Sequence, residues 1–576
     1  MLRNVPDQGP RTLQSCDRLK SRCEVGETAL SVGRDSGPPP DRRPVRKALL
    51  GSALAGTLVV ASTTASRAAP DASPAAAQQC SVQIDIQSYA LGGAKQDPDV
   101  ARLSADIDKA FAAALKKAQD PASLDPYHQM RALGELGIFD KNLSVGKNLA
   151  CSSCHAPDAG FTGGVSLYNQ TIVAQPGSVT TPAAKHPAPD FRIAARKPQS
   201  YGYAPFSPIL EYDAVQKQFT GGNFWDMRAT GFQLGNPAAE QARGPPTNPL
   251  EMGLSDPACA VHRLSQSSYR GLFELVWGAQ SFAINWPANV ETVCATPGPP
   301  PAGDPLPVHL SAVDRGTANS TFDHLAMSIA AYEASPDVSP FSSKFDYAVA
   351  HPQEQVLSRE ELAGWELFRG KGKCNSCHLD GMENTAGTRS GPAASRHPGA
   401  GEKNSAPLFS DFQPHNLGVP ANRALPYYCE TGQDQSGFVA NPLGASYVDH
   451  GVGGFLASTS NPNRQWAQHA GQFEGTFQTP TLRNVDKRPR PDFVKAYMHN
   501  GYFKSLKQVV HFYNTRDVLP RCADPLDPRA GTACWPAAEV SANESKTLGH
   551  LGLSDQEENA IVDFLKTLTD GYARAP

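Results

Sequence analysis

Two short segments with the same pattern constrain this chain more than any other feature. Cys-x-x-Cys-His occurs at Cys151–His155 and again at Cys374–His378. The two thiols of such a segment can add to the vinyl groups of a haem, and the adjacent histidine then supplies an axial ligand to the iron. A zinc site would need a second pair of thiolates or histidines nearby, and neither copy has one. The sequence therefore predicts two covalently bound haem c groups, held by Cys151, Cys154, His155, Cys374, Cys377 and His378.

The length and the charge of the chain limit the classes of protein to which it can belong. The chain has 576 residues, which suits two or three domains, and 40% of them are hydrophobic. Its 52 lysines and arginines against 56 aspartates and glutamates give no basic excess, so we expect no nucleic-acid partner. The 50 prolines and 49 glycines favour long loops around short helices.

The N-terminal region has the composition of an export signal. A basic stretch, Arg42–Lys47, precedes the apolar run Ala48–Ala61 and small residues that end at Ala68. The apolar run is short for a bilayer span, so we expect no stable membrane insertion, with an uncleaved anchor as the alternative. We expect a signal peptide around 42–68 and a mature chain that begins near Ala69 in the periplasm.

The remaining cysteines suit an oxidising compartment. Of the 12 cysteines, four belong to the haem segments and two precede the signal peptide. Six are left, an even number. Cys522 with Cys534 would close a Pro-rich loop, and Cys259 with Cys294 is a second candidate pair. The other two are Cys80 and Cys429.

Apolar periodicity and capping residues predict a mainly α fold. We expect five helices, two of which lead into the haem segments: 97–118, 127–139, 322–333, 358–368 and 554–568. No strand pattern is sustained, and residues 383–476 read as an elaborated loop region. The same order of helix, haem segment, ligand loop and helix occurs twice, which predicts two cytochrome-c-like haem domains with long loops. We expect an N-terminal extension and signal peptide (1–68), an N-terminal haem c domain (69–340) and a C-terminal haem c domain (341–576).

Six further motifs lie in order along the chain. They are Phe224–Ala229, Gln241–Pro245, Asn248–Met252, Phe409–Gly418, Thr479–Val485 and Tyr497–Gly501. With the two haem segments, they make the chain resemble the bacterial di-haem cytochrome c peroxidases and their MauG-type relatives, from about Leu133 to Leu568. The resemblance implies an enzyme that uses hydrogen peroxide.

Three residues are expected to carry the catalytic chemistry. Cleaving the O–O bond needs a proton removed from the near oxygen and returned to the departing one, and a carboxylate above the iron can do both. The resemblance assigns this role to Glu251, assigns peroxide orientation to Gln241, and makes Trp225 the electron carrier between the haems. The alternatives are an ordinary surface carboxylate for Glu251 and a core residue for Trp225. Arg228 and Arg483 would pair with haem propionates, or else form surface salt bridges.

The axial residues decide which iron is open to peroxide. No histidine lies between Ala156 and Lys185, and His186 follows in a Pro-rich loop. We therefore expect an always-open first haem, as the MauG-type pattern implies. For the second haem, the matching ligand position falls on Tyr513, with His511 as the fallback, whereas Met498 does not match that position.

The resemblance also implies a calcium ion between the domains. The matching stretch here reads Arg196-Lys197-Pro198, and residues 486–495 read as an insertion. A lysine cannot ligate calcium, which argues against this site.

Several functions remain open at this point. The first is a periplasmic peroxidase with a small cytochrome c or a cupredoxin as electron donor. The second is a MauG-like oxidase that uses peroxide to oxidise residues of a partner protein or peptide. A pure electron-transfer cytochrome is disfavoured by Gln241 and Glu251, and a haem oxygenase acting on a hydrophobic polymer is a further alternative.

Overall fold

The structure is a computed structural model that describes residues 97–120, 124–179, 192–382 and 406–573. The predicted signal peptide, Cys80 and His186 lie outside the described residues.

Helices α2 (Pro98–Lys117), α3 (Pro126–Phe139) and α11 (Ala312–Glu333) build the N-terminal half. The first two confirm the predicted helices, and α2 has Asp97 as its N-cap with a proline in its first turn. Helix α11 begins at Ala312 and not near Phe322, because Ser311 caps it by accepting a hydrogen bond from the backbone of Asp314. The first turns of α11 are mostly exposed, so they lack the apolar periodicity that sequence analysis relies on.

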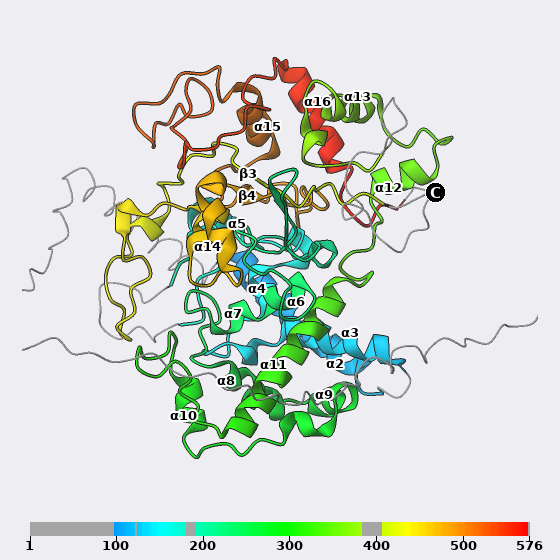
Figure 1. Cartoon of the computed structure of the whole chain (residues 1–576). Helices are drawn as coiled ribbons and strands as arrows, with labels where there is room; N and C mark the ends of the chain where they lie inside the picture. Colours follow the sequence, from blue (N-terminus) through cyan, green and yellow to red (C-terminus); the bar gives the residue numbers. More distant parts are fainter. Residues whose placement is uncertain (1–96, 121–123, 180–191, 383–405, 574–576) are drawn as a thin grey trace, which may run out of the picture. The chain divides into compact units, whose positions relative to one another are not determined.

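The helix that precedes each haem segment crosses a later helix at a glycine. In the N-terminal half, α3 packs on α11, and a Cβ added at Gly134 would lie 1.9 Å from the carbonyl oxygen of Ser328. In the C-terminal half, α13 (Arg359–Arg369) packs on α16 (Asp555–Lys566), as Figure 1 shows. A Cβ added at Gly364 would lie 1.9 Å from the carbonyl oxygen of Ala560. The two halves thus share one packing plan.

Replacing Gly364 by alanine should lower the free energy of unfolding by about 1–3 kcal/mol, because the added methyl group must push α13 away from α16. Gly316→Ala is the matched control, since Gly316 lies in α11 and a Cβ added there would meet no atom within 4 Å. That substitution should instead stabilise by roughly 0.5–1 kcal/mol. Denaturant unfolding measures both, and an equal response of the two variants would contradict this packing.

The remaining elements are short. The other α-helices are α4 (Cys151–Cys154), α5 (Ser166–Thr171), α6 (Pro237–Ala242), α7 (Gly244–Thr247), α8 (Pro257–Ser265), α9 (Arg270–Trp277), α10 (Val290–Ala295), α12 (Lys344–Ala350), α14 (Gly451–Ala457) and α15 (Leu506–Thr515). Strands β1 (Glu211–Asp213) and β2 (Gln218–Thr220) pair antiparallel, as do β3 (Pro414–His415) and β4 (Phe477–Gln478). The fold is therefore helix-rich, as predicted, and α14 lies within the region that was expected to be loop.

The two largest of several hydrophobic clusters draw on different stretches of the described chain. One draws on residues 103–338 together with Phe493, and the other on residues 345–568. Segment 477–504 joins the halves: Lys495 Nζ donates to the carbonyl of Ala159 (2.8 Å), and the backbone of Lys197 donates to that of His499 (2.7 Å). The predicted domain boundary at residues 340 and 341 stays a prediction.

Two disulfides confirm the predicted pairs Cys259–Cys294 and Cys522–Cys534. Cys429 is also disulfide-bonded. Among the described residues, no helix is long and apolar enough to cross a membrane.

Candidate active site

The first Cys-x-x-Cys-His segment opens onto a cavity of about 240 Å³. Its walls carry most of the predicted residues of the N-terminal half: Cys154, His155, Trp225, Arg228, Gln241 and Glu251. An adjoining small cavity of about 30 Å³ adds Cys151 and is also lined by Gln241 and Glu251. The structure therefore brings the first haem segment and the proposed acid–base residues together around one space.

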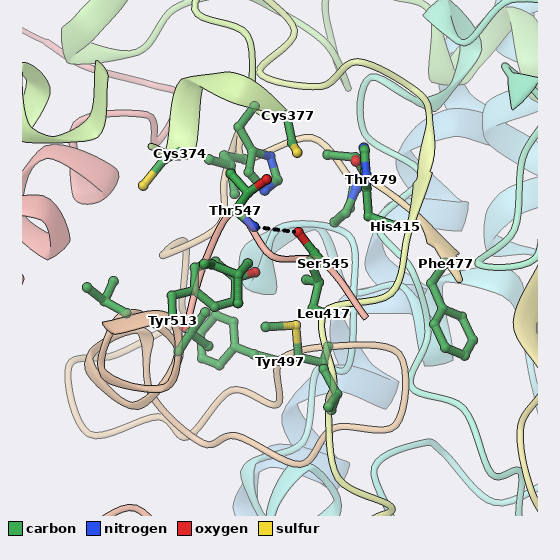
Figure 2. Close-up of a pocket in the computed structure, with 18 of the residues that line it drawn as sticks. Cys374, Cys377, His415, Leu417, Phe477, Thr479, Tyr497, Tyr513, Ser545 and Thr547 are labelled. Atoms are coloured by element: carbon green, nitrogen blue, oxygen red, sulfur yellow. Dashed lines mark hydrogen bonds between the residues drawn. The ribbon is translucent and has the colours of Figure 1, made fainter. Parts of the chain in front are cut away.

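The second segment opens onto another cavity, of about 180 Å³. Cys374, Cys377, His378 and Tyr513 line it, although 136 residues separate Cys377 from Tyr513 in the sequence. Figure 2 shows the two cysteines at the upper side of this cavity and the Tyr513 ring at its lower side. Tyr513 is carried there by α15, which Ser505 caps through a hydrogen bond from the backbone of Gln508. The predicted ligand position thus faces the predicted haem segment.

Both histidines are held in the form that binds a metal. His155 Nδ1 donates to the carbonyl of Phe161 (3.1 Å), and His378 Nδ1 donates to that of Phe409 (3.0 Å). Because a carbonyl can only accept, Nε2 keeps a free lone pair in each ring. Burial lowers the pKa of His155 to about 4 and also lowers that of His378, so both rings are neutral near pH 7.

The two accepting carbonyls repeat an unusual backbone geometry. Phe161 and Phe409 have φ values of +60° and +50°, in the left-handed region that residues other than glycine adopt rarely. The two histidine anchors are therefore equivalent positions in the two halves. Such strain persists where the surrounding structure fixes it, often at functional sites.

The donor set fits two haem c groups. All four cysteines of the two segments are free thiols, and burial raises the pKa of Cys151 and Cys374 to about 12. Buried phenol and imidazole atoms, Tyr201 Oη and His499 Nε2, lie in the cavity walls without a hydrogen-bond partner. A covalently bound haem c needs two thiols and an imidazole nitrogen that is free to bind iron. The cavities supply these groups, and their walls also hold buried polar atoms that have no hydrogen-bond partner.

Glu251 lies in the first cavity as a carboxyl group with a single side-chain donor. Asn248 Nδ2 donates to Glu251 Oε1 at 2.5 Å, so the Asn-Pro-Leu-Glu turn after α7 fixes the orientation of the carboxyl. Burial raises the pKa of Glu251, and the charge of Arg228 and the bond from Asn248 oppose this rise. Gln241, near the end of α6, lines the same cavity. An ordinary surface carboxylate would not have these surroundings.

Trp225 lines both large cavities. Its side chain is 8% exposed, and its Nε1 donates to the carbonyl of Lys197 (2.9 Å). Its own carbonyl accepts from the backbone of Gln478 in β4 (2.9 Å). Lys197 therefore fixes the indole of Trp225 from one half of the chain, and Gln478 fixes its backbone from the other.

The two arginines have different surroundings. Arg228 lines the first cavity, pairs with Asp226 (2.8 Å) and stacks on Phe224, with its guanidinium carbon 3.8 Å from the ring centroid. Arg483 is 1% exposed and donates to both carboxylate oxygens of Asp346 (2.7 and 2.8 Å) and to the carbonyl of Pro407. It does not line the second cavity. This geometry favours a structural role for Arg483, and its propionate contact stays a prediction.

The fallback ligand is placed outside the second cavity. His511 Nδ1 contacts Glu558 Oε1 at 2.9 Å, and the ring does not line that space. Met498 does line it, together with Tyr513. Burial raises the pKa of the Tyr513 phenol, so a cation such as iron must be near to hold it as phenolate.

The lysine that argues against a calcium site is buried. Lys197 Nζ donates to the carbonyl of Pro198 (3.0 Å) and lies 5.8 Å from the centroid of the Trp225 ring. Burial lowers the pKa of Lys197 to about 7.

Sequence reasoning missed a charged network between the cavities. Arg196 donates to Asp226 (2.7 Å) and to both carboxylate oxygens of Asp449 (2.6 and 2.7 Å). The network lowers the pKa of Asp226 and of Asp449. A neighbouring pair, Asp411 and His415 (2.8 Å), lies in a recognised motif, but no residue pattern assigned it a role. Asp449 could not be found from sequence, because it lies more than 200 residues from both partners.

Comparisons with known proteins show which family the chain resembles. The family model for di-haem cytochrome c peroxidase matches residues 128–354. The methylamine utilization protein MauG of Paracoccus denitrificans is 30% identical over 77% of this chain and 88% of its own. The cytochrome c551 peroxidase of Nitrosomonas europaea is 25% identical over 46% of this chain and 54% of its own.

A solved structure shows the same fold. The di-haem peroxidase BthA from Burkholderia thailandensis superposes with a TM-score of 0.52 at 24% sequence identity. The match covers 78% of this chain and 89% of that one.

The chain belongs to the di-haem cytochrome c peroxidase family, which includes MauG. It is accordingly a haem-dependent oxidoreductase that uses peroxide.

Proposed function

We propose that the chain is a periplasmic di-haem c-type peroxidase that reduces hydrogen peroxide at the first cavity. Electrons would reach it from the C-terminal haem through Trp225. The proposal includes two haem domains, 69–340 and 341–576, each with one covalent haem c. The observation that carries it is the position of Trp225, which lines both the cavity of Glu251 and the cavity of Tyr513.

The residues of the chain have separate roles in this proposal. When bound, the first haem supplies the redox-active iron at which peroxide takes up two electrons. Gln241 orients the peroxide, and Glu251 removes a proton from the near oxygen and delivers it to the leaving oxygen. With two electrons and two protons in all, peroxide becomes two molecules of water. His155 and His378 would hold the irons, and Arg228 would bind a propionate. A small cytochrome c or a cupredoxin would supply the electrons.

One observation favours a second candidate, a MauG-like oxidase. Tyr513 faces the second haem segment across the cavity, whereas His511 turns away to Glu558. An anionic phenolate ligand stabilises oxidised iron, and such a haem suits the storage of an oxidising equivalent better than the acceptance of electrons. The electrons would then come from residues of a partner protein or peptide.

Mass spectrometry of the protein purified from the periplasm tests the cofactor assignment. It should show a chain that begins near Ala69 and carries two haem additions, because both segments have free thiols at a cavity edge. Cys374→Ala with Cys377→Ala should leave one addition. A single addition in the wild type, or haem that acid acetone extracts, would contradict the proposal.

Steady-state peroxide consumption separates the two candidates. Sustained turnover with a reduced small cytochrome c or cupredoxin supports the peroxidase. Consumption that requires an oxidisable protein or peptide supports the MauG-like oxidase, and no consumption with either would exclude both.

A further inference from the structure

Three tyrosines contact one another beside the peroxide cavity. The ring centroids of Tyr427 and Tyr447 are 5.1 Å apart, and that of Tyr428 lies 6.4 Å and 6.1 Å from them, all in edge-on contact. Tyr427 and Tyr447 line the cavity that holds Glu251 and Gln241, whereas Tyr428 does not. This tyrosine cluster (Tyr427, Tyr428 and Tyr447) therefore leads away from the site where peroxide would react.

A buried carboxylate stands behind the cluster. Tyr428 Oη donates to Glu539 Oε1 at 3.4 Å, and the side chain of Glu539 is 5% exposed. The same oxygen accepts from the backbone of Asp449 (3.0 Å), and Glu539 Oε2 lies 3.7 Å from His499 Nε2. Oxidation of a phenol to a neutral radical releases its proton, so a redox-active tyrosine needs a base within hydrogen-bond reach. Tyr428 has one.

A purely structural role would not explain why the three residues of the cluster are tyrosines. The rings pack with Val173, Leu425 and Ala496, and phenylalanines would fill the same space. Burying a phenol hydroxyl together with a carboxylate costs desolvation without a packing gain. The guanidinium carbon of Arg423 lies 4.5 Å from the centroid of the Tyr428 ring, so a cation also faces the cluster.

We propose that the tyrosine cluster is a second acceptor for the oxidising equivalent generated at the peroxide cavity, in parallel with Trp225. This inference rests on the proposed function. Tyr428 gives one electron, through Tyr427 or Tyr447, to the oxidised haem of that cavity, and passes its phenolic proton to Glu539. The products are a neutral tyrosyl radical, a protonated Glu539 and a centre reduced by one electron. An external one-electron donor restores Tyr428, and the proton returns from Glu539.

Freeze-quench EPR of the holoenzyme tests this step. Protein carrying ring-deuterated tyrosine is mixed with peroxide without a donor, and haem absorbance is followed in the same samples. A radical signal that narrows with the label is expected in the wild type. It should be lost in Tyr428→Phe and weakened in Glu539→Gln, and Trp225→Phe should increase it by blocking the competing route.

The matched control is Tyr347→Phe. Tyr347 Oη also donates to a glutamate, Glu354 (3.1 Å), but it does not line either large cavity, so its loss should leave the signal unchanged.

The outcomes separate this inference from the proposed function. A haem response without a labelled radical, or a radical that persists in Tyr428→Phe, would overturn the proposed role of the tyrosine cluster. Either result would leave the proposed function standing. Loss of the radical in Trp225→Phe would place the cluster downstream of Trp225 and would overturn the parallel route. If haem absorbance does not respond to peroxide at all, the proposed function fails and the inference fails with it.

Discussion

Replacing Glu251 by glutamine is expected to slow the reaction with peroxide by ~10²–10⁴-fold, the usual contribution of a positioned acid–base group. Glutamine keeps the size of the side chain and its contact with Asn248, but it cannot take up the peroxide proton. Stopped-flow absorbance of the haem bands after mixing with peroxide measures this rate.

The pH dependence gives this prediction a second readout. Removal of the peroxide proton needs the carboxylate form, so the rate should rise with pH as Glu251 ionises. Because burial raises the pKa of Glu251, this rise should lie above the range of an ordinary glutamate. Glu251→Gln should abolish it.

Glu291→Gln serves as the control for Glu251, because Glu291 has a 65% exposed side chain and pairs with His262 away from the cavity. The control should leave both the rate and its pH profile unchanged. Equal rates in wild type and Glu251→Gln would show that Glu251 only lines the cavity and does not transfer protons.

Replacing Tyr513 by phenylalanine is expected to alter the spectrum of the second haem and to raise its reduction potential by on the order of 100 mV, because axial ligands set haem potentials over a wide range. Tyr513 reaches the cavity from the side opposite Cys374 and Cys377 (Figure 2). A spectroelectrochemical titration of the two haems measures the shift.

Tyr497→Phe is the matched control, since Tyr497 lines the same cavity and its hydroxyl lies 3.5 Å from Arg488. It should change the potential much less than Tyr513→Phe does. If Tyr513→Phe leaves the second haem unchanged, Met498 becomes the next candidate, because it lines the cavity and His511 does not.

Local signals in the sequence predicted the parts of the fold that depend on neighbouring residues. Ser358 with Glu361 and Ser554 with Glu557 form capping boxes at the starts of α13 and α16, as their three-residue spacing indicates. The start of α11 was missed, because its cap at Ser311 precedes turns that face solvent. Capping chemistry can be read over four residues, whereas burial of a helix depends on the whole fold.

In the candidate site, too, some features could be predicted from local sequence and others could not. Motifs and their spacing predicted Glu251, Trp225 and Tyr513 as site residues, and all three line the two cavities. The contacts that orient them come from remote segments: Phe409 anchors His378 from 31 residues away, and Asp346 holds Arg483 from 137 residues away. Tyr428 and Glu539 are 111 residues apart and belong to no recognised motif. Pairing over such distances is a property of the packed chain and leaves no periodic signal.

Addition of peroxide to the fully oxidised protein tests the central claim most directly. In the proposed account, Glu251 and Gln241 stand beside an always-open first haem, and Trp225 connects it to a tyrosine-ligated second haem. Peroxide should then act without prior reduction. The absorbance bands of both haems should then change together, and the change at the second haem should depend on Tyr513. A protein that stays inert until it is half-reduced would contradict the account and would make His186 the suspected gate.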